Sequence, residues 1–420
     1  MYALVDCNNF FVSCERVFRP DLNQKPVVVL SGNDGCVVAR SNEVKRLGIK
    51  MGEPFYQIQE EVKKYGIVHF SSNFALYADL SSRIMRILGR YTPDLQQYSI
   101  DEAFLDMSHL TSYDEARRIC FEIREEIMHG IGIPVSIGIA PTKTLCKVAS
   151  DYAKHYSGYK GVCTIDNESK RLKALEKYPV ADIWGIGRKS SAKLTAAGIN
   201  TALQFAAASA VRVKNLLHKP GLDTWRELNG EDCISMQELP QKQSITCSRT
   251  FAHGVTDRQL LEQALTDFCA TCAAKLRSQR SVCRHVVVFA HTSRFREQQD
   301  FIHATITLQI PTANTIELTQ EVLRAVRSQW RKNIPYKRAG IILMSIESDA
   351  AMQQTLFDLR DRNRDMRLQN AIDNVNRQYG KRTVVIAPQL QTPESRELID
   401  IGRKSPAYTT RLSDIITLHC

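Results

Sequence analysis

Residues 1–19 read MYALVDCNNFFVSCERVFR, and this stretch sets the fold of the first part of the chain. Tyr2 to Asp6 is a short apolar run that ends in a carboxylate, which is typical of a buried strand. Phe11 to Phe18 has the apolar spacing of a short helix. The chain therefore begins with a strand–helix unit that carries an aspartate at the end of its strand.

The same alternation of strand and helix patterns continues to about residue 165. Further strands are predicted at PVVVL (26–30), QQYSID (96–101), EAFLDM (102–107) and PVSIGIA (134–140). A helical run lies between residues 76 and 88, and an amphipathic helix follows the third of these strands, with its apolar stripe formed by Ala116, Cys120, Ile123 and Ile127. If residues 20–76 are an inserted subdomain, the remaining order is that of the split βαβ, or ferredoxin-like, sheet.

The second half of the chain divides at a polar linker. From residue 166 the periodicity is helical, and it is broken by WGIG at 184–187. MQELPQKQS (236–244) has the composition of a linker, and a second mixed domain follows it to about residue 348. The remaining tail is rich in Asn, Gln and Arg, which predicts either a weakly folded extension or a partner-binding arm.

Charge is distributed unevenly along these regions. Residues 1–140 carry 15 Lys and Arg against 18 Asp and Glu, whereas residues 141–230 carry 15 against 7. An acidic domain followed by basic ones is typical of a metal-binding domain joined to domains that grip a polyanion, although solvated helix faces give the same counts. The N-terminus has no export signal and no stretch of about 20 apolar residues is present, so we expect a cytoplasmic protein without a membrane span.

Three carboxylates are predicted to meet at one end of the first sheet. Asp6 closes the first strand, and Asp101 and Glu102 lie where two later strands meet. Oxygen ligands of this kind suit Mg²⁺, and two such ions can promote an in-line phosphoryl displacement. Neighbouring strand residues face opposite ways, so both acids can serve only at a turn. From the charge pattern alone, a solvated hairpin tip is the alternative.

At this point a family resemblance adds to the pattern. The chain resembles the Y-family of translesion DNA polymerases, and within it the UmuC-type catalytic subunits, in the following segments: YALVDCNNFFVSCE, NDGCVVARSNEVKRLGIKMGEP, FSSNFALYADLSSR, YSIDEAFLD, VSIGIAPTKTLCKVASDYAK, DIWGIGRKSSAKL and SPAYTTR. The resemblance implies a multidomain α+β right-hand polymerase. Its parts would be a ferredoxin-like palm (1–19 and 77–165), small fingers (20–76), a helical thumb with a helix-hairpin-helix (166–240), an α/β little finger (241–348) and a C-terminal partner-binding extension (349–420).

The resemblance also implies roles for residues of the active site. Asp6, Asp101 and Glu102 match the catalytic metal ligands, with the backbone carbonyl of Cys7 as a further ligand and two Mg²⁺ ions per site. Phe11 matches the steric gate, an aromatic ring that would collide with a ribose 2′-hydroxyl. The nucleotide-binding set is completed by Phe10, Lys45 and Lys154.

Outside the active site, three binding elements are predicted. In the helix-hairpin-helix from Val180 to Ile199, glycines let backbone amides approach a DNA phosphate. The predicted DNA contacts are Gly185, Gly187, Arg188, Lys189 and Lys193 there, with Arg249, Arg277 and Arg284 in the little finger. In the tail, residues 353–357 (QQTLF) resemble a sliding-clamp peptide, with Gln353, Leu356 and Phe357 as its contacts.

The predicted function is error-tolerant, template-directed DNA synthesis on primer–template DNA from deoxynucleoside triphosphates, within the SOS response to DNA damage. The implied partners are a UmuD′-like dimer, a RecA filament and the sliding clamp. Two alternatives remain open from the sequence. A nucleotide cyclase also places metal carboxylates on a ferredoxin-like sheet, and a catalytically silent DNA-binding subunit would keep the basic domains.

Overall fold

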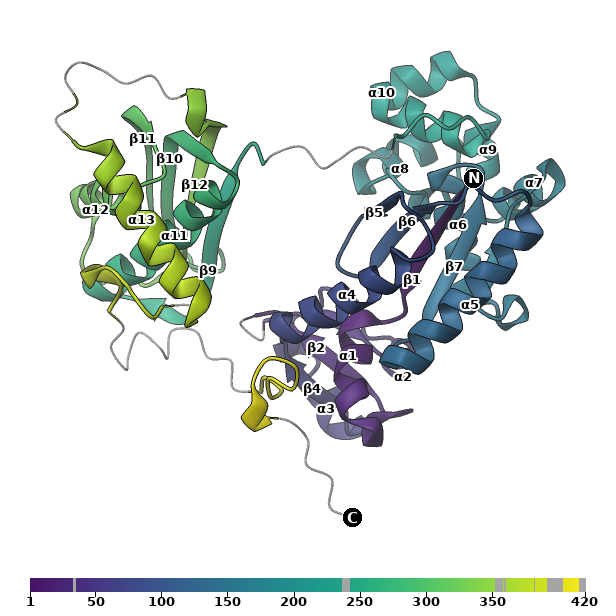
Figure 1. Ribbon diagram of the computed structural model, residues 1–420, viewed down its shortest axis with the longest axis horizontal. Coiled ribbons are helices and arrows are strands. Elements are labelled where there is room, and N and C mark those ends of the chain that lie inside the picture. The colour runs from purple at the N-terminus through teal and green to yellow at the C-terminus, as the bar shows by residue number, and fades with distance from the viewer. Residues whose placement is uncertain are drawn as a thin grey trace. The chain divides into compact units, whose positions relative to one another are not determined.

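The computed structural model describes residues 1–32, 35–235, 242–351, 358, 360–380, 382–390 and 403–414. The chain folds as two compact units, one formed by Met1–Glu238 with Arg403–Cys420 and the other by Leu239–Gly402 (Figure 1). The end of the predicted C-terminal extension thus belongs to the first unit. Within the described residues, no helix has both the length and the apolar character needed to span a membrane.

The first unit is built around a five-stranded sheet with β1 at its centre. The strand order is β5 (Leu95–Gln97), β6 (Glu102–Asp106), β1 (Tyr2–Cys7), β7 (Val135–Ala140) and β8 (Val162–Thr164). β1 is antiparallel to both of its neighbours, as a ferredoxin-like sheet requires. This central position explains why β1 is almost wholly apolar, because both of its faces are covered.

Helices cover the two faces of this sheet and form two cores. Ala3 and Val5 pack in one core with helices α1 (Phe10–Phe18), α4 (Phe74–Leu88) and α5 (Tyr113–Ile131). Leu4 packs in the other core with α6 (Lys143–His155). The four residues of the predicted apolar stripe are the buried residues of α5, so that prediction is confirmed.

Between α1 and α4 lies a small sheet with its own core, and α4 begins at Phe74, inside the bounds 20–76 predicted for the insertion. The strand order of this sheet is β3 (Val37–Arg40), β2 (Val27–Leu30) and β4 (Val68–Ser71), and α2 (Asn42–Arg46) and α3 (Gln59–Tyr65) accompany it. Residues 166–230 are helical, with α7 (Glu168–Glu176), α8 (Arg188–Ala196), α9 (Ala202–Ala206) and α10 (Ala210–Leu228). The predicted helix before the glycine hairpin is wrong: Pro179 and Ile183 are both extended and leave room for one 3-10 turn, Val180–Asp182.

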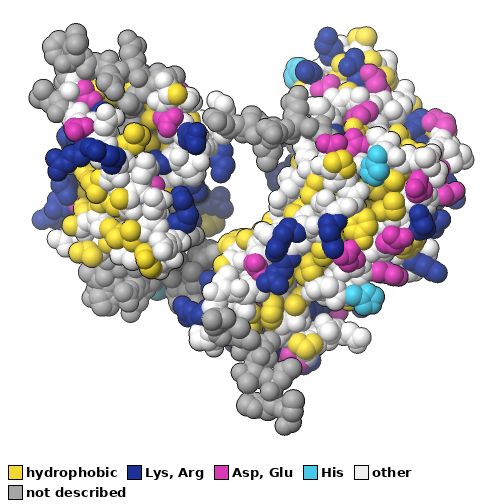
Figure 2. Space-filling model, viewed as in Figure 1, with side chains coloured by type: hydrophobic (Ala, Val, Ile, Leu, Met, Phe, Trp, Pro, Cys, Tyr) yellow, Lys and Arg dark blue, Asp and Glu magenta, His cyan; other side chains and the backbone are white. Residues whose placement is uncertain are grey.

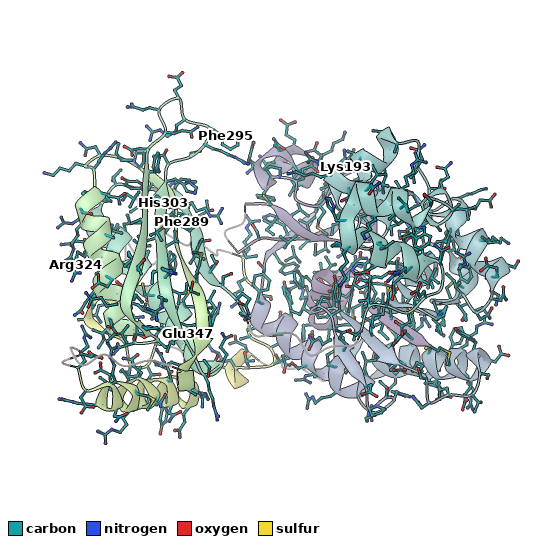
Figure 3. The ribbon with its side chains drawn as sticks, turned by 90° about the horizontal axis from the view of Figure 1, so that it is seen from above. Lys193, Phe289, Phe295, His303, Arg324 and Glu347 are labelled. Carbon is teal, nitrogen blue, oxygen red and sulfur yellow. The ribbon has the colours of Figure 1, made fainter. Side chains whose placement is uncertain are left out.

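The second unit is an antiparallel sheet covered by helices on one face. The strand order is β11 (Phe301–Thr312), β10 (Ser281–His291), β12 (Tyr336–Ser348) and β9 (Ile245–Val255). α11 (Arg258–Ser278) and α12 (Thr315–Gln329) share the core with this sheet. Phe289 and His303 lie on the side of the sheet opposite Arg324 of α12 (Figure 3).

The first part of the tail is folded onto the second unit. Helix α13 (Arg362–Gln378) is held by an Arg362–Glu317 ion pair of 2.7 Å and an Arg277–Asp373 ion pair of 2.7 Å. The prediction of a weakly folded extension is therefore wrong for α13, because charged residues of the tail find partners on the preceding domain. The multidomain α+β architecture predicted from the sequence is confirmed.

Candidate active site

The pairing of β1 with β6 brings three carboxylates to one end of the central sheet. Asp6 lies directly opposite Glu102 in the antiparallel register. The backbone N–H of Cys7 donates to the carbonyl oxygen of Asp101 at 2.9 Å. Asp101 precedes β6 in the turn after β5, where the backbone N–H groups of Tyr98 and Ser99 both donate to the carbonyl of Glu102. Because Asp101 is in a turn, strand alternation does not force it away from Glu102.

Two lysines of α6 contact two of these carboxylates. Lys154 Nζ lies 2.9 Å from Asp6 Oδ1, and Lys147 Nζ lies 2.7 and 2.8 Å from the two carboxylate oxygens of Glu102. The two lysines are seven residues apart, so they lie two helical turns apart on one face of α6. All four side chains are between 17% and 26% exposed, which weakens solvent screening of the pairs.

Lys147 is a site residue that the sequence reasoning missed. Its ammonium lies 4.6 Å from the ring centroid of Tyr98 and 5.9 Å from that of Trp184. The Trp184 indole N–H donates to the Tyr98 hydroxyl at 2.9 Å. The WGIG segment thus helps to hold a lysine of the active site. The seven-residue spacing between Lys147 and Lys154 was the sequence signal that could have revealed this residue.

The carboxylates of the site are partly neutralised by lysines. Burial raises the pKa of Glu102, Lys147 opposes the rise, and the carboxylates of Asp6 and Asp101 add to it. Burial also raises the pKa of the Cys7 thiol, so this side chain stays protonated. In the described part of the chain no three acidic, His or Cys side chains already converge on one metal position. Asp6 and Glu102 are paired with lysines instead. The oxygen donors that Mg²⁺ prefers are therefore present, but two of the carboxylates also bind ammonium groups.

The aromatic residues after β1 have different environments. Phe10 is 3% exposed, so its ring belongs to the core, and its backbone N–H lies in the first turn of α1, where helix N–H groups have no partner within the helix. Phe11 is half-buried, and its ring stacks on Tyr77 of α4 at 4.4 Å between centroids and 14° between planes. Phe74 packs edge-on against Phe11. Phe11 is thus held from behind in a fixed orientation.

The insertion contributes a third lysine to this region. Partial burial and the nearby charges of Lys154 and Arg40 lower the pKa of Lys45, which lies on α2. Lys45 and Lys154 repel each other, and an anion bound between them would relieve this repulsion. Both lysines therefore remain candidates for binding a triphosphate.

The glycine hairpin before α8 has the geometry of a phosphate site. Gly185 has a φ of +87°, and a Cβ at this position would lie 2.8 Å from Thr224 Oγ1, so no other residue fits there without strain. Gly187 is the N-cap of α8 and has no side chain to cap it, which leaves the first N–H groups of the helix without a side-chain partner. Arg188, Lys189 and Lys193 are exposed on this helix, and Figure 3 labels Lys193.

The predicted DNA contacts of the second unit need one correction. Arg277 is only 12% exposed and binds Asp373 and the carbonyl of Ala313, so it holds α13 and is not a free cation. Arg249 is exposed, and Arg284 is partly exposed at 3.7 Å from Glu347. On the visible face, acidic side chains are denser over the first unit than over the second (Figure 2). The predicted clamp peptide, Gln353 to Phe357, lies outside the described residues.

Family models match most of the chain. Residues 5–151 match the impB/mucB/samB family, and residues 242–356 match the C-terminal domain of that family. Residues 366–418 match a domain of unknown function, DUF4113. A Y-family DNA polymerase chimera of Dbh and Dpo4 shares the fold, with a TM-score of 0.65 at 20% identity over 83% of this chain and 99% of that chain.

Full-length relatives agree with these matches. Protein SamB of Salmonella typhimurium is 41% identical and protein UmuC of the same species is 38% identical, each over 99% of both chains. DNA polymerase IV 1 of Bacillus subtilis is 27% identical over 93% of this chain and 94% of that protein. On these matches, the chain belongs to the impB/mucB/samB family, the UmuC-type branch of the Y-family DNA polymerases.

Proposed function

We propose that the protein is an error-tolerant DNA polymerase that adds deoxynucleotides to a primer by two-metal nucleotidyl transfer. The observation that carries the proposal is the placement of Asp6, Asp101 and Glu102 at one end of the central sheet, with two lysines of α6 against two of them. Three acids at one end of the sheet repel one another, and the two lysines pair with only two of them, so a further cation would stabilise the site. The arrangement is therefore suited to metal-bound phosphates.

In this proposal the three carboxylates and the carbonyl of Cys7 hold two Mg²⁺ ions. The ions would activate the primer 3′-hydroxyl and stabilise the leaving pyrophosphate. Lys154 and Lys45 bind the triphosphate, with the open N–H groups at the start of α1. Lys147 is a positioning residue, because it orients Glu102 through both carboxylate oxygens.

Phe11 selects the sugar in this scheme. Its ring is fixed by Tyr77 and Phe74, so it cannot turn away from a nucleotide bound beside it. A ribose 2′-hydroxyl would collide with the ring, whereas a deoxyribose would fit. The glycine hairpin and α8 bind the DNA backbone without reading bases, which suits an enzyme that acts at any sequence.

Translesion synthesis in the SOS response, with a UmuD′-like dimer, a RecA filament and the sliding clamp as partners, is part of the proposal. It is supported by the 38% identity to protein UmuC over the whole chain. Primer extension on damaged and undamaged templates, with and without each partner, tests this part. Extension past a lesion that does not change when every partner is added would contradict the partner assignments.

The chemistry itself is tested by comparing wild type with Asp101→Ala in primer extension with Mg²⁺. Asp94→Ala is the matched control, because Asp94 is an exposed acid just before β5 of the same hairpin. We expect extension by wild type and Asp94→Ala and a loss of at least about 100-fold in Asp101→Ala. Equal extension by all three proteins would remove the proposed chemistry. A cyclic product from ATP or GTP without DNA would favour the cyclase alternative.

A further inference from the structure

Residues 403–411, in the last described segment of the chain, belong to the first unit and lie near α1 and β4 (Figure 1). We call these residues the C-terminal clasp. The backbone N–H of Ser71 donates to the carbonyl of Arg403 at 3.1 Å, and Ser71 and Lys404 form a parallel bridge at the end of β4. The Tyr408 ring stacks on Phe18, the last residue of α1, at 4.5 Å and 8°. The clasp therefore joins the insertion to α1.

Ser405 is the buried centre of the clasp. Its hydroxyl donates to Glu15 Oε1 at 3.1 Å and accepts from the Asn73 side-chain amide at 3.0 Å. The same amide lies 3.2 Å from the carbonyl oxygens of Ser405 and Pro406. Asn73 Oδ1 in turn accepts from the backbone N–H of Leu76 and caps α4. The clasp thus fixes the first turn of the helix that carries Tyr77.

Glu15 connects Ser405 to the aromatic ring behind Phe11. Glu15 and Tyr77 are both 0% exposed, and the Tyr77 hydroxyl donates to Glu15 Oε1 at 2.6 Å. The same oxygen accepts from Ser405, so one atom joins the tail to Tyr77. The Tyr77 ring stacks on Phe11. A continuous set of contacts therefore leads from Ser405 through Glu15 and Tyr77 to Phe11.

A buried carboxylate in this position needs both of its donors. Burial raises the pKa of Glu15, and the hydrogen bonds from Tyr77 and Ser405 oppose the rise. Within the described residues, Glu15 Oε2 has no hydrogen-bond partner. Both hydrogen bonds to the Glu15 carboxylate are therefore made to Oε1. If Ser405 no longer donates, the Glu15 carboxylate and the Tyr77 side chain that is bonded to it can shift together.

We propose that the C-terminal clasp is a positioning element for sugar selection, in which Ser405 acts through Glu15 to hold Tyr77 against the Phe11 ring. This assigns a role to part of the region that matches a domain of unknown function. The proposal rests on the polymerase function proposed above. Ser405, Glu15 and Tyr77 are positioning residues, because the contacts lead to Phe11 and not to a nucleotide.

The test measures single-nucleotide incorporation by the full-length chain with matched deoxy- and ribonucleoside triphosphates. We expect Ser405→Ala to lower the ratio of kcat/KM for deoxy- over ribonucleotide by about 3- to 10-fold, less than the full effect of one hydrogen bond to a charged group, because Ser405 acts on the Phe11 ring only through Glu15 and Tyr77. Ser413→Ala is the matched control, because Ser413 is an exposed serine of the same tail that bonds only Asp414 among the described residues. It should leave the ratio unchanged. In a Tyr77→Phe background, Ser405→Ala should have almost no further effect, since both changes act through Glu15.

A second readout does not depend on catalysis. The chain is labelled with 3-fluorotyrosine, and the ¹⁹F signal of Tyr77 is assigned by its absence in Tyr77→Phe. We expect this signal to shift in Ser405→Ala and to stay in place in Ser413→Ala. If Ser405→Ala does not fold, Ser405→Cys keeps the size of the side chain with a weaker donor and should give a smaller change in the same direction.

The two readouts separate the proposals. A wild type that incorporates no nucleotide would remove the proposed function, and the fluorine signal would still show whether the clasp positions Tyr77. If wild type polymerises and Ser405→Ala keeps the sugar ratio of Ser413→Ala, the clasp proposal is overturned. A Tyr77 signal that does not move in Ser405→Ala overturns it as well.

Discussion

Replacing Lys147 by methionine removes one cation from the active site and keeps the length and apolar stem of the side chain. Lys147 bonds both oxygens of Glu102 at 2.7 and 2.8 Å, and the two side chains are 17% and 18% exposed. A hydrogen-bonded charge pair with this little solvent contributes about 2 kcal/mol. In a unit of this size, that loss lowers the melting temperature by roughly 4–8 °C.

Magnesium should restore much of this loss. In Lys147→Met the Glu102 carboxylate has no ammonium beside it, so its pKa rises further and its ionised form lacks a counter-charge. A bound Mg²⁺ supplies that charge. We therefore expect Mg²⁺ to raise the melting temperature of Lys147→Met more than that of wild type, in scans with Mg²⁺ and with a chelator.

The control for Lys147→Met is Lys170→Met. Lys170 contacts Asp166, four residues earlier in the chain, at 2.6 Å. The side chains of Lys170 and Asp166 are 52% and 23% exposed, so this pair is on the surface. Such a pair contributes only about 0.3–0.5 kcal/mol, and Mg²⁺ should not change its effect. Equal losses in the two variants, or equal responses to Mg²⁺, would refute the reasoning that places Lys147 in a shared charge network.

Other predictions follow from the same structure. Phe11→Ala should raise ribonucleotide incorporation roughly 10- to 100-fold relative to deoxynucleotide, measured as the ratio of kcat/KM values; unchanged discrimination would eliminate the gate assignment. Replacing Arg188, Lys189 and Lys193 together by alanine should reduce the slope of log affinity against log salt by about 2–3 in DNA-binding titrations, and an unaltered slope would exclude α8 from the phosphate contacts. Burial raises the pKa of Glu15 in the folded protein, so folding favours the protonated form of this side chain. The stability that this contributes is fully present below the unfolded pKa and is lost as pH rises through the folded pKa. Wild type should therefore lose stability relative to Glu15→Gln in urea titrations as pH rises above the unfolded pKa of about 4.3, and a difference that stays constant with pH would contradict this.

The sequence by itself determined the elements whose signal is local. The apolar run of β1 and the stripe of four buried residues on α5 depend only on residues a few positions apart, and both patterns appear in the structure. The strand at 26–30 and the helical spacing after residue 165 also have counterparts in the structure, β2 and α7 to α10. The shortened turn at Val180–Asp182 was missed because the prediction followed helical spacing and gave too little weight to Pro179.

Only the tertiary structure decided which polar groups are partners. Arg277 was predicted to contact DNA, and the structure pairs it with Asp373, 96 residues away. Lys147 reaches Glu102 across 45 residues, and Ser405 reaches Glu15 across 390. Periodicity shows which face of a helix is buried, but it does not show which distant segment covers that face. Pairs of this kind exist only once the sheet register and the packing of α6 and the C-terminal clasp have brought their side chains within hydrogen-bond distance.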